Sequence, residues 1–290
     1  MKQQLHLYWF SGSGNTLQAA SVFAERLRQR EWSVELRPLE QSDPLAIDPE
    51  AVLGLAFPTY FFAIPEMVRT FVRSLPRTEG TSAMMLGTHG VLSGGVVGPM
   101  KRELTAKGFR CVAARILVMP DSFFPLLGSR IHRWQLTRGL KSAKRYADDF
   151  ADERVRWTRW AILSDLHGAL FGGMFAARKW TRNCYSTVFA RNKLCTRCGI
   201  CIQCCPVNAL ESYATSHSAS HSEKATDSPP RPKRNCTNCL RCVAVCPHDA
   251  MRHIIGFPYR SEDATSLERH FKEAIAQTQI QDQPQNLPQG

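Results

Sequence analysis

The sequence of 290 residues lacks any long uninterrupted hydrophobic run. A long uncharged stretch, residues 82–100, contains several glycines, a proline and a histidine, which favours a strand and a loop over a membrane span. The apolar run Leu5–Phe10 near the start is too short for the core of a secretory signal peptide. We therefore expect no membrane span and a cytoplasmic protein.

Several nucleotide-binding and hydrolytic motifs are also missing. No G-x4-G-K-[ST] motif occurs, which argues against a P-loop nucleotide-binding protein. Gly12 and Gly14 fit the start of a dinucleotide fingerprint, but Leu17 stands where its third glycine belongs. No Ser/His/Asp or paired-carboxylate arrangement stands out. We therefore expect no nicotinamide site, no catalytic residues of the hydrolytic kind, and an electron donor that is itself a protein.

Cysteine is abundant, with eleven residues in the chain. Eight of them form two runs of the pattern C-x2-C-x2-C-x3-C-P, namely Cys195, Cys198, Cys201 and Cys205, and then Cys236, Cys239, Cys242 and Cys246. This pattern is typical of a pair of [4Fe–4S] clusters in which the fourth cysteine of each run binds the other cluster. It predicts one cluster on Cys195, Cys198, Cys201 and Cys246, and another on Cys236, Cys239, Cys242 and Cys205. The alternative is a pair of zinc sites, which would not need the doubled pattern with its prolines.

The chain has fewer acidic than basic residues, with 25 Asp and Glu against 37 Lys and Arg, which gives a formal net charge of +12. The excess is concentrated in residues 128–193, where 14 Lys and Arg face 5 Asp and Glu. We expect a basic helical connector at 128–190 that attracts the acidic docking face of a protein redox partner. A nucleic-acid or regulatory role is a lesser alternative, because no recognition module is visible, and no nucleic acid is expected as partner.

The first 127 residues alternate apolar strand-like runs with helix-like ones. Five strands are predicted, at Leu5–Phe10, Trp32–Arg37, Ala51–Phe57, Ala83–Thr88 and Phe109–Met119. Strands that alternate with helices indicate an α/β fold, a doubly wound parallel sheet covered on both faces. A small α+β iron–sulfur domain is predicted at 191–258, with a mobile Ser/Thr/His/Pro-rich insertion at 211–235. A C-terminal helix and tail are predicted at 259–290.

Three loops follow strands of the first domain. Residues Tyr8–Thr16 resemble the FMN-phosphate loop of the flavodoxins, Phe57–Pro65 resembles their second flavin loop, and Leu86–Gly90 is similar to the third. Joined to a two-cluster ferredoxin module, the whole resembles the flavodoxin–ferredoxin fusion proteins called ferrodoxins. The resemblance implies a flavodoxin-like sheet of order 2-1-3-4-5. It also implies FMN bound by three sets of residues: Ser11, Ser13, Gly14, Asn15 and Thr16 at the phosphate; Pro58, Thr59 and Tyr60 along the ring; and Thr88, His89 and Gly90 on the far side.

These features together predict an electron-transfer protein. A flavin exchanges electrons in pairs or singly, whereas each cluster carries one at a time, so the three centres would form a relay to a protein redox partner. The alternative is a flavin-dependent iron–sulfur oxidoreductase that acts directly on a small substrate.

Overall fold

A computed structural model describes residues 3–60, 63–90, 95–121, 128–157, 187–211, 229–254, 268–269 and 271–273. Its N-terminal part is a five-stranded parallel sheet in the order β2-β1-β3-β4-β5. The strands are β1 (Gln4–Trp9), β2 (Ser33–Pro38), β3 (Val52–Pro58), β4 (Ser82–His89) and β5 (Arg110–Val118). This is the flavodoxin-like, doubly wound order, as predicted.

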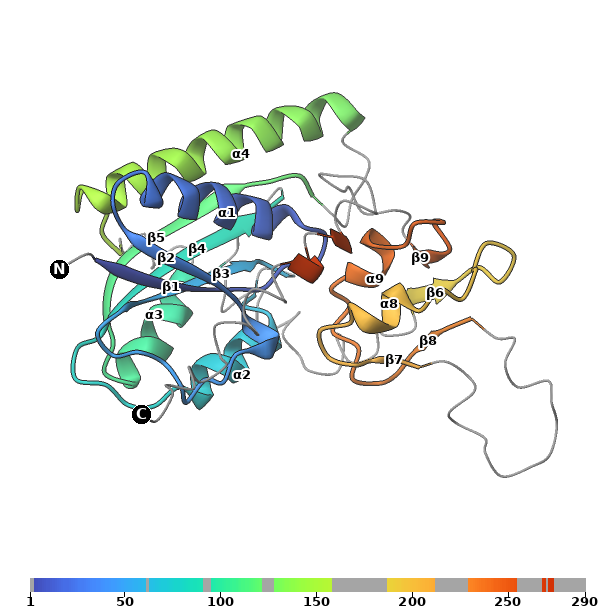
Figure 1. Ribbon diagram of the computed structural model, residues 1–290, viewed down its shortest axis with the longest axis horizontal. Helices are drawn as coiled ribbons and strands as arrows, with labels where there is room; N and C mark the ends of the chain where they lie inside the picture. Colours follow the sequence, from blue (N-terminus) through green and yellow to red (C-terminus); the bar gives the residue numbers. More distant parts are fainter. Residues whose placement is uncertain are drawn as a thin grey trace, which may run out of the picture.

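Helices cover both faces of the sheet (Figure 1). One face carries α1 (Asn15–Arg28) and α4 (Gly128–Ala151), and the other carries α2 (Glu66–Ser74) and α3 (Val97–Ala106). A short 3₁₀ helix, η1 (Leu39–Gln41), follows β2. The central strands are buried on both faces, which explains their nearly continuous apolar sequences. The sheet therefore presents its carboxyl ends to one side, where ligands of this fold class bind.

The helix α4 differs from the basic connector that the sequence predicted. Its Ala143, Tyr146, Ala147 and Phe150 are buried in the core shared with α1, and the Tyr146 hydroxyl donates to the Met85 carbonyl at 2.9 Å. The many basic residues of α4 mask its apolar stripe in the sequence, because long basic side chains can lie along both edges of a buried helix face. Residues 128–151 therefore belong to the flavodoxin-like unit, which extends beyond the predicted boundary at 127.

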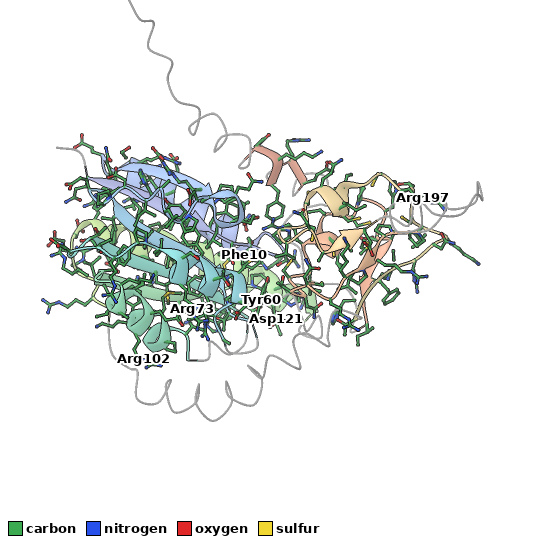
Figure 2. The ribbon with its side chains drawn as sticks, turned by 90° about the horizontal axis from the view of Figure 1, so that it is seen from below. Phe10, Tyr60, Arg73, Arg102, Asp121 and Arg197 are labelled. Atoms are coloured by element: carbon green, nitrogen blue, oxygen red, sulfur yellow. The ribbon has the colours of Figure 1, made fainter. Side chains whose placement is uncertain are left out.

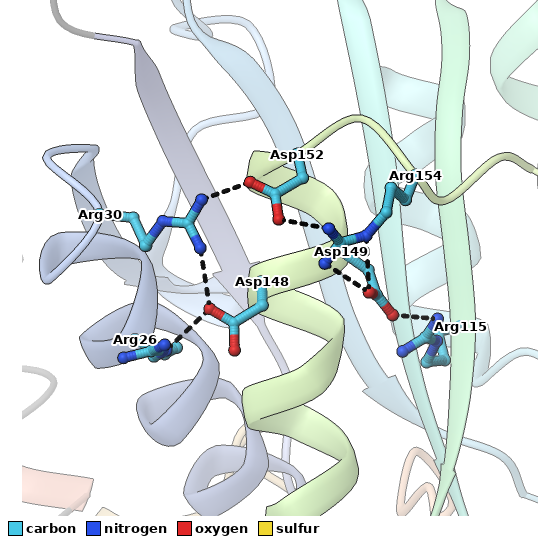
Figure 3. A network of polar contacts seen from close by, with 7 residues as sticks. All are labelled: Arg26, Arg30, Arg115, Asp148, Asp149, Asp152 and Arg154. Carbon is cyan, nitrogen blue, oxygen red and sulfur yellow. Dashed lines mark hydrogen bonds and ion pairs between the residues drawn. The ribbon is translucent and has the colours of Figure 1, made fainter.

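A polar network fixes the C-terminal end of α4 (Figure 3). Asp148 accepts hydrogen bonds from Arg26 of α1 at 2.8 Å and from Arg30, which lies just after α1, at 3.2 Å. Asp149 accepts from Arg115 of β5 at 3.0 Å and from Arg154. The network ties α4 to both a neighbouring helix and an edge strand. Residues 158–186 of the predicted connector lie outside the described residues.

The second unit is small and built from an internal repeat. It contains β6 (Val188–Ala190) paired with β9 (Met251–His253), β7 (Leu210–Glu211) paired with β8 (Arg231–Pro232), and two short helices, α8 (Ile200–Gln203) and α9 (Arg241–Ala244). Backbone with positive φ recurs at Arg197 and Asn238, Gly199 and Leu240, and Asn208 and Asp249. The two cysteine runs therefore fold alike, as their shared spacing requires.

The remaining segments of the chain are described only in part. The pairing of β7 with β8 closes the predicted insertion at its base, and residues 212–228 within it lie outside the described residues. Of the predicted C-terminal helix, residues 268–269 and 271–273 are described and helical. Phe271 there is fully buried and stacks on Trp9 with a ring-centroid distance of 5.9 Å. The C-terminal segment is thus anchored at the carboxyl end of β1.

Candidate functional site: two cysteine-lined cavities beside the sheet

The Ser11–Thr16 loop connects β1 to α1 at the carboxyl end of the sheet. Gly14 precedes the helix with φ of 90°, a left-handed conformation that glycine adopts without strain, and α1 has no side-chain cap. Ser11, Ser13, Asn15 and Thr16 are all buried. The Asn15 amide donates to the Ser13 hydroxyl at 3.3 Å and to the Pro120 carbonyl at 3.0 Å. The loop thus gathers hydroxyls and an uncapped helix N-terminus, the donors that an anion requires.

The loops after β3 and β4 lie beside it. Pro58 ends β3 in register with Thr88, and the Thr59 amide donates to the Thr88 carbonyl at 2.7 Å. The Thr88 hydroxyl is 2.7 Å from that of Thr16, so this side chain braces the Ser11–Thr16 loop from β4. Gly90 packs against Asp121, whose side chain would lie 2.2 Å from a Cβ added there.

Three buried polar atoms in these loops have no hydrogen-bond partner among the described residues. They are Ser11 Oγ after β1, Thr59 Oγ1 after β3 and His89 Nδ1 at the end of β4. Burial lowers the pKa of His89, against an opposing effect of Asp121, so its imidazole is neutral at neutral pH. Buried polar groups normally have partners. Their clustering at the carboxyl ends of three neighbouring strands fits a bound polar ligand.

The cysteines line two cavities in the second unit. The first cavity is lined by Cys195, Cys198, Cys201 and Cys246. The second cavity is lined by Cys205, Cys236, Cys239 and Cys242. The fourth cysteine of each run faces the cavity of the other run. Each cavity is therefore lined by three cysteines of one run and the fourth of the other, and that these eight cysteines bind clusters stays a prediction.

Backbone amides point at several of these sulfurs. Ala209 N–H and Ala250 N–H donate to the sulfurs of Cys205 and Cys246, both at 3.2 Å, and Asn238 N–H donates to Cys236 at 3.4 Å. Such bonds stabilise thiolates and tune cluster potentials. Burial raises the pKa of Cys201 to about 12 and that of Cys236 to about 11, so cluster assembly must displace protons from these thiols.

Of the remaining described cysteines, neither Cys204 nor Cys111 lines either cavity. Cys204 is buried and packs in the core with residues of the flavodoxin-like unit, and burial raises the pKa of its thiol. Cys111 lies on β5. Cys184 lies outside the described residues. Cys205, unlike its neighbour Cys204, lines the second cavity, and its role as a cluster ligand stays a prediction.

The second cavity abuts the carboxyl end of the sheet. The Tyr60 hydroxyl donates to the Cys239 carbonyl at 3.3 Å, and its ring meets Phe10 edge-on at 6.1 Å (Figure 2). A Cβ added at Gly12 would lie 2.0 Å from the same carbonyl oxygen, so only glycine permits this approach. Burial raises the pKa of Tyr60 well above its ordinary value, with a further contribution from Cys239. The resemblance placed Tyr60 along a flavin ring, whereas the structure shows it in contact with the cysteine unit.

Arg241 completes this junction, and sequence reasoning missed it. Its guanidinium donates to the Ser11 carbonyl from Nε at 3.0 Å and from Nη2 at 2.8 Å, and its Nη1 pairs with Glu40 at 2.5 Å. The side chains of Arg241 and Glu40 are 2% and 5% exposed. The signal lay in the internal repeat, because Arg241 stands where the first run has the apolar Ile200.

Comparisons with known proteins match the two parts of the chain separately. Residues 194–250 match the family of 4Fe-4S dicluster domains. Among curated proteins, no match is found. The chain is similar to solved flavodoxins over about half of its length. The flavodoxin of Streptococcus pneumoniae TIGR4 is 17% identical with a TM-score of 0.40, and the match covers 52% of this chain and 99% of that one. A flavodoxin from the domain Archaea is 15% identical with a TM-score of 0.37 and coverages of 52% and 98%, and that of Megasphaera elsdenii is 19% identical with a TM-score of 0.36 and coverages of 49% and 98%.

The strand order and the dicluster match together define the class of protein. The chain joins a flavodoxin-like α/β unit to a 4Fe–4S dicluster domain, in the order of a flavodoxin–ferredoxin fusion. Two [4Fe–4S] clusters are the metal centres of the second unit. In the described residues, no helix is long and apolar enough to cross a membrane.

Proposed function

We propose that this protein transfers electrons between a bound FMN and its two [4Fe–4S] clusters, and from these to a protein redox partner. The observation that carries the proposal is the contact between the Ser11–Thr16 loop and the second cavity, where Gly12 meets the Cys239 carbonyl. Electron transfer needs short distances between centres, and this contact brings an anion-binding loop of a flavodoxin-like sheet next to a cluster site.

The residues at the carboxyl ends of the strands suit FMN. The hydroxyls of Ser11, Ser13 and Thr16, with the amides at the start of α1, would hold its phosphate. The two unsatisfied atoms Thr59 Oγ1 and His89 Nδ1 would meet polar groups of the ring system. FMN, when bound, supplies a centre that accepts two electrons and releases them singly. Pro58, Asn15 and Thr88 shape these loops, and Gly14 permits the turn into the helix.

The eight cavity cysteines would hold the two clusters, four to each cavity. In this assignment Cys195, Cys198, Cys201 and Cys246 bind one cluster, and Cys205, Cys236, Cys239 and Cys242 bind the other. The amide-to-sulfur hydrogen bonds at Cys205, Cys236 and Cys246 fit thiolate ligands, since they stabilise negative charge on sulfur.

A face around the first cavity suits an acidic partner. Cys198 is exposed there, and the segment from Thr187 to Cys204 contains Arg191, Lys193 and Arg197 but no Asp or Glu. Phe189, Leu194 and Ile254 of the same unit are 41%, 39% and 64% exposed. Cations attract a complementary acidic surface, against which exposed apolar side chains can then be buried. A cytoplasmic location remains a prediction.

Reduction of carrier proteins of opposite charge tests this function. The full holoprotein, reduced anaerobically, is mixed with cytochrome b5, which is acidic, and separately with cytochrome c, which is basic. We expect fast one-electron reduction of cytochrome b5 whose rate falls as salt is added, because screening removes the attraction. A rate with cytochrome b5 that is insensitive to salt, or turnover of a small substrate without any transfer to carriers, would contradict the proposal.

A further inference from the structure

The two cavities are not equivalent in their surroundings. Cys198 of the first cavity is exposed, and Figure 2 places the adjacent Arg197 at the end of the molecule away from Phe10 and Tyr60. Cys239 of the second cavity contacts Gly12 and Tyr60 of the flavodoxin-like unit through its carbonyl. The second cavity is therefore the one that touches the proposed flavin site.

A buried ion pair is built into this contact. Arg241 lies between the cysteines at 239 and 242, and its guanidinium donates to the carbonyl of Ser11, the first residue of the Ser11–Thr16 loop. Nη1 also lies 3.4 Å from the Cys204 carbonyl. Glu40 of η1 supplies the counter-charge through Oε1, while its Oε2 has no hydrogen-bond partner among the described residues. One side chain thus links three segments of the chain.

Two aromatic rings lie against the guanidinium of Arg241. Its central carbon lies 4.4 Å from the ring centroid of Phe271 and 5.7 Å from that of Phe10. Rings on a guanidinium favour its charged form and exclude water. The charges of Arg241 and Glu40 are therefore poorly screened, and each acts on neighbouring charges over a longer range than a surface ion would.

We propose that the cluster in the second cavity is the one adjacent to the flavin site, and that the Glu40–Arg241 pair is its positioning device, which fixes the contact and sets this cluster's reduction potential. The inference rests on the proposed function for the identity of the flavin. Reduction adds one electron, and so one negative charge, to the cluster, and the donor is oxidised by one electron. A nearby positive charge favours the reduced cluster and a nearby negative charge disfavours it.

We call the cluster in the second cavity the near cluster. Removing Glu40 and removing Arg241 must therefore shift its reduction potential in opposite directions. Glu40→Gln leaves Arg241 uncompensated and raises the potential of the near cluster. Arg241→Met leaves the Glu40 carboxylate and lowers it. A purely structural role for the pair predicts no such opposition. Arg234→Met is the matched control, because Arg234 lies two residues before Cys236 but is exposed to solvent.

The test is a potentiometric titration of the full holoprotein at neutral pH, followed by electron paramagnetic resonance. The signal that Cys205→Ser removes identifies the near cluster. We expect Glu40→Gln to shift its one-electron reduction equilibrium about tenfold, which corresponds to 59 mV, with a smaller shift of the other cluster. Arg241→Met gives the opposite sign, and Arg234→Met gives little change.

Glu40→Gln is decisive because it is nearly isosteric and leaves Arg241 in place. A shift no larger than that of Arg234→Met, or an equal shift of both clusters, overturns the proposal, whatever Arg241→Met does. FMN released from the same samples is measured separately. Its absence would refute the proposed flavin function, while the cluster potentials would still decide the role of Glu40 and Arg241.

Discussion

The Tyr60 hydroxyl donates a hydrogen bond to the Cys239 carbonyl across 3.3 Å, and the two residues belong to different units of the chain. Tyr60 follows β3 of the flavodoxin-like sheet, and Cys239 lines the second cavity. One polar contact therefore joins the proposed flavin site to a proposed cluster ligand.

Replacing Tyr60 by Phe removes this bond and leaves the ring in place. A net hydrogen bond contributes about 1 kcal/mol, so we expect about fivefold faster amide hydrogen exchange in residues 239–244. Tyr146→Phe is the matched control, because its hydroxyl also donates to a backbone carbonyl, at Met85, but inside the flavodoxin-like unit. Equal exchange in both variants would show that the Tyr60 contact does not hold the units together.

Gly12→Ala tests the close approach of the two units directly. The added Cβ would lie 2.0 Å from the Cys239 carbonyl oxygen, and this backbone atom cannot move aside alone. We expect a loss of about 1–3 kcal/mol of stability and a larger radius of gyration by small-angle scattering. Gly80→Ala is the control, since its φ of +99° strains alanine but its Cβ meets nothing within 4 Å. Scattering from Gly12→Ala identical to that of the control would argue against the interface.

The neighbours Cys204 and Cys205 are predicted to have different roles, the first as a core residue and the second as a cluster ligand. Cys205 lines the second cavity, whereas Cys204 is buried in the core outside both cavities. We expect Cys204→Ala to retain about eight irons per chain and Cys205→Ser to lose up to about four of them. Iron and acid-labile sulfide analysis of anaerobically purified protein measures this. Iron loss in Cys204→Ala with full retention in Cys205→Ser would reverse the assignment.

The α4 network should make stability depend on pH. Burial raises the pKa of Asp149, but hydrogen bonds from Arg115 and Arg154 outweigh it, and the net pKa is lowered. A carboxyl whose pKa is lower in the folded state stabilises the fold above its unfolded pKa of about 3.9, and this contribution disappears as pH falls through the folded pKa.

We therefore expect Asp149→Asn to lose up to about 1 kcal/mol at pH 7, because the pair is partly exposed and screened, and to lose less as pH falls below about 4. Urea unfolding followed by circular dichroism measures it. Glu153→Gln, two residues beyond the end of α4 and exposed, is the control. A difference between the two variants that does not change with pH would contradict the assigned role of Asp149.

Much of the fold and of the cluster site could be predicted because both depend on local signals. Cysteine spacing fixes which sulfurs can surround one cavity, and alternating apolar runs fix strands and helices. The packing of α4 could not be predicted, because its buried face is flanked by arginines and lysines whose charge dominates the sequence. The Glu40–Arg241 pair could not be predicted either, since its members are 201 positions apart and meet only through the junction. Tyr60 was assigned to the flavin on resemblance, and its contact with Cys239 depends on the same junction.

The most direct test of the central claim is the amount of iron, acid-labile sulfide and released FMN per chain in protein purified without oxygen. Two cubane clusters and one flavin predict about eight irons, about eight sulfides and one FMN. Eight irons without FMN, in protein supplied with the flavin during expression, would contradict the relay and leave a dicluster domain attached to a flavodoxin-like unit of another function.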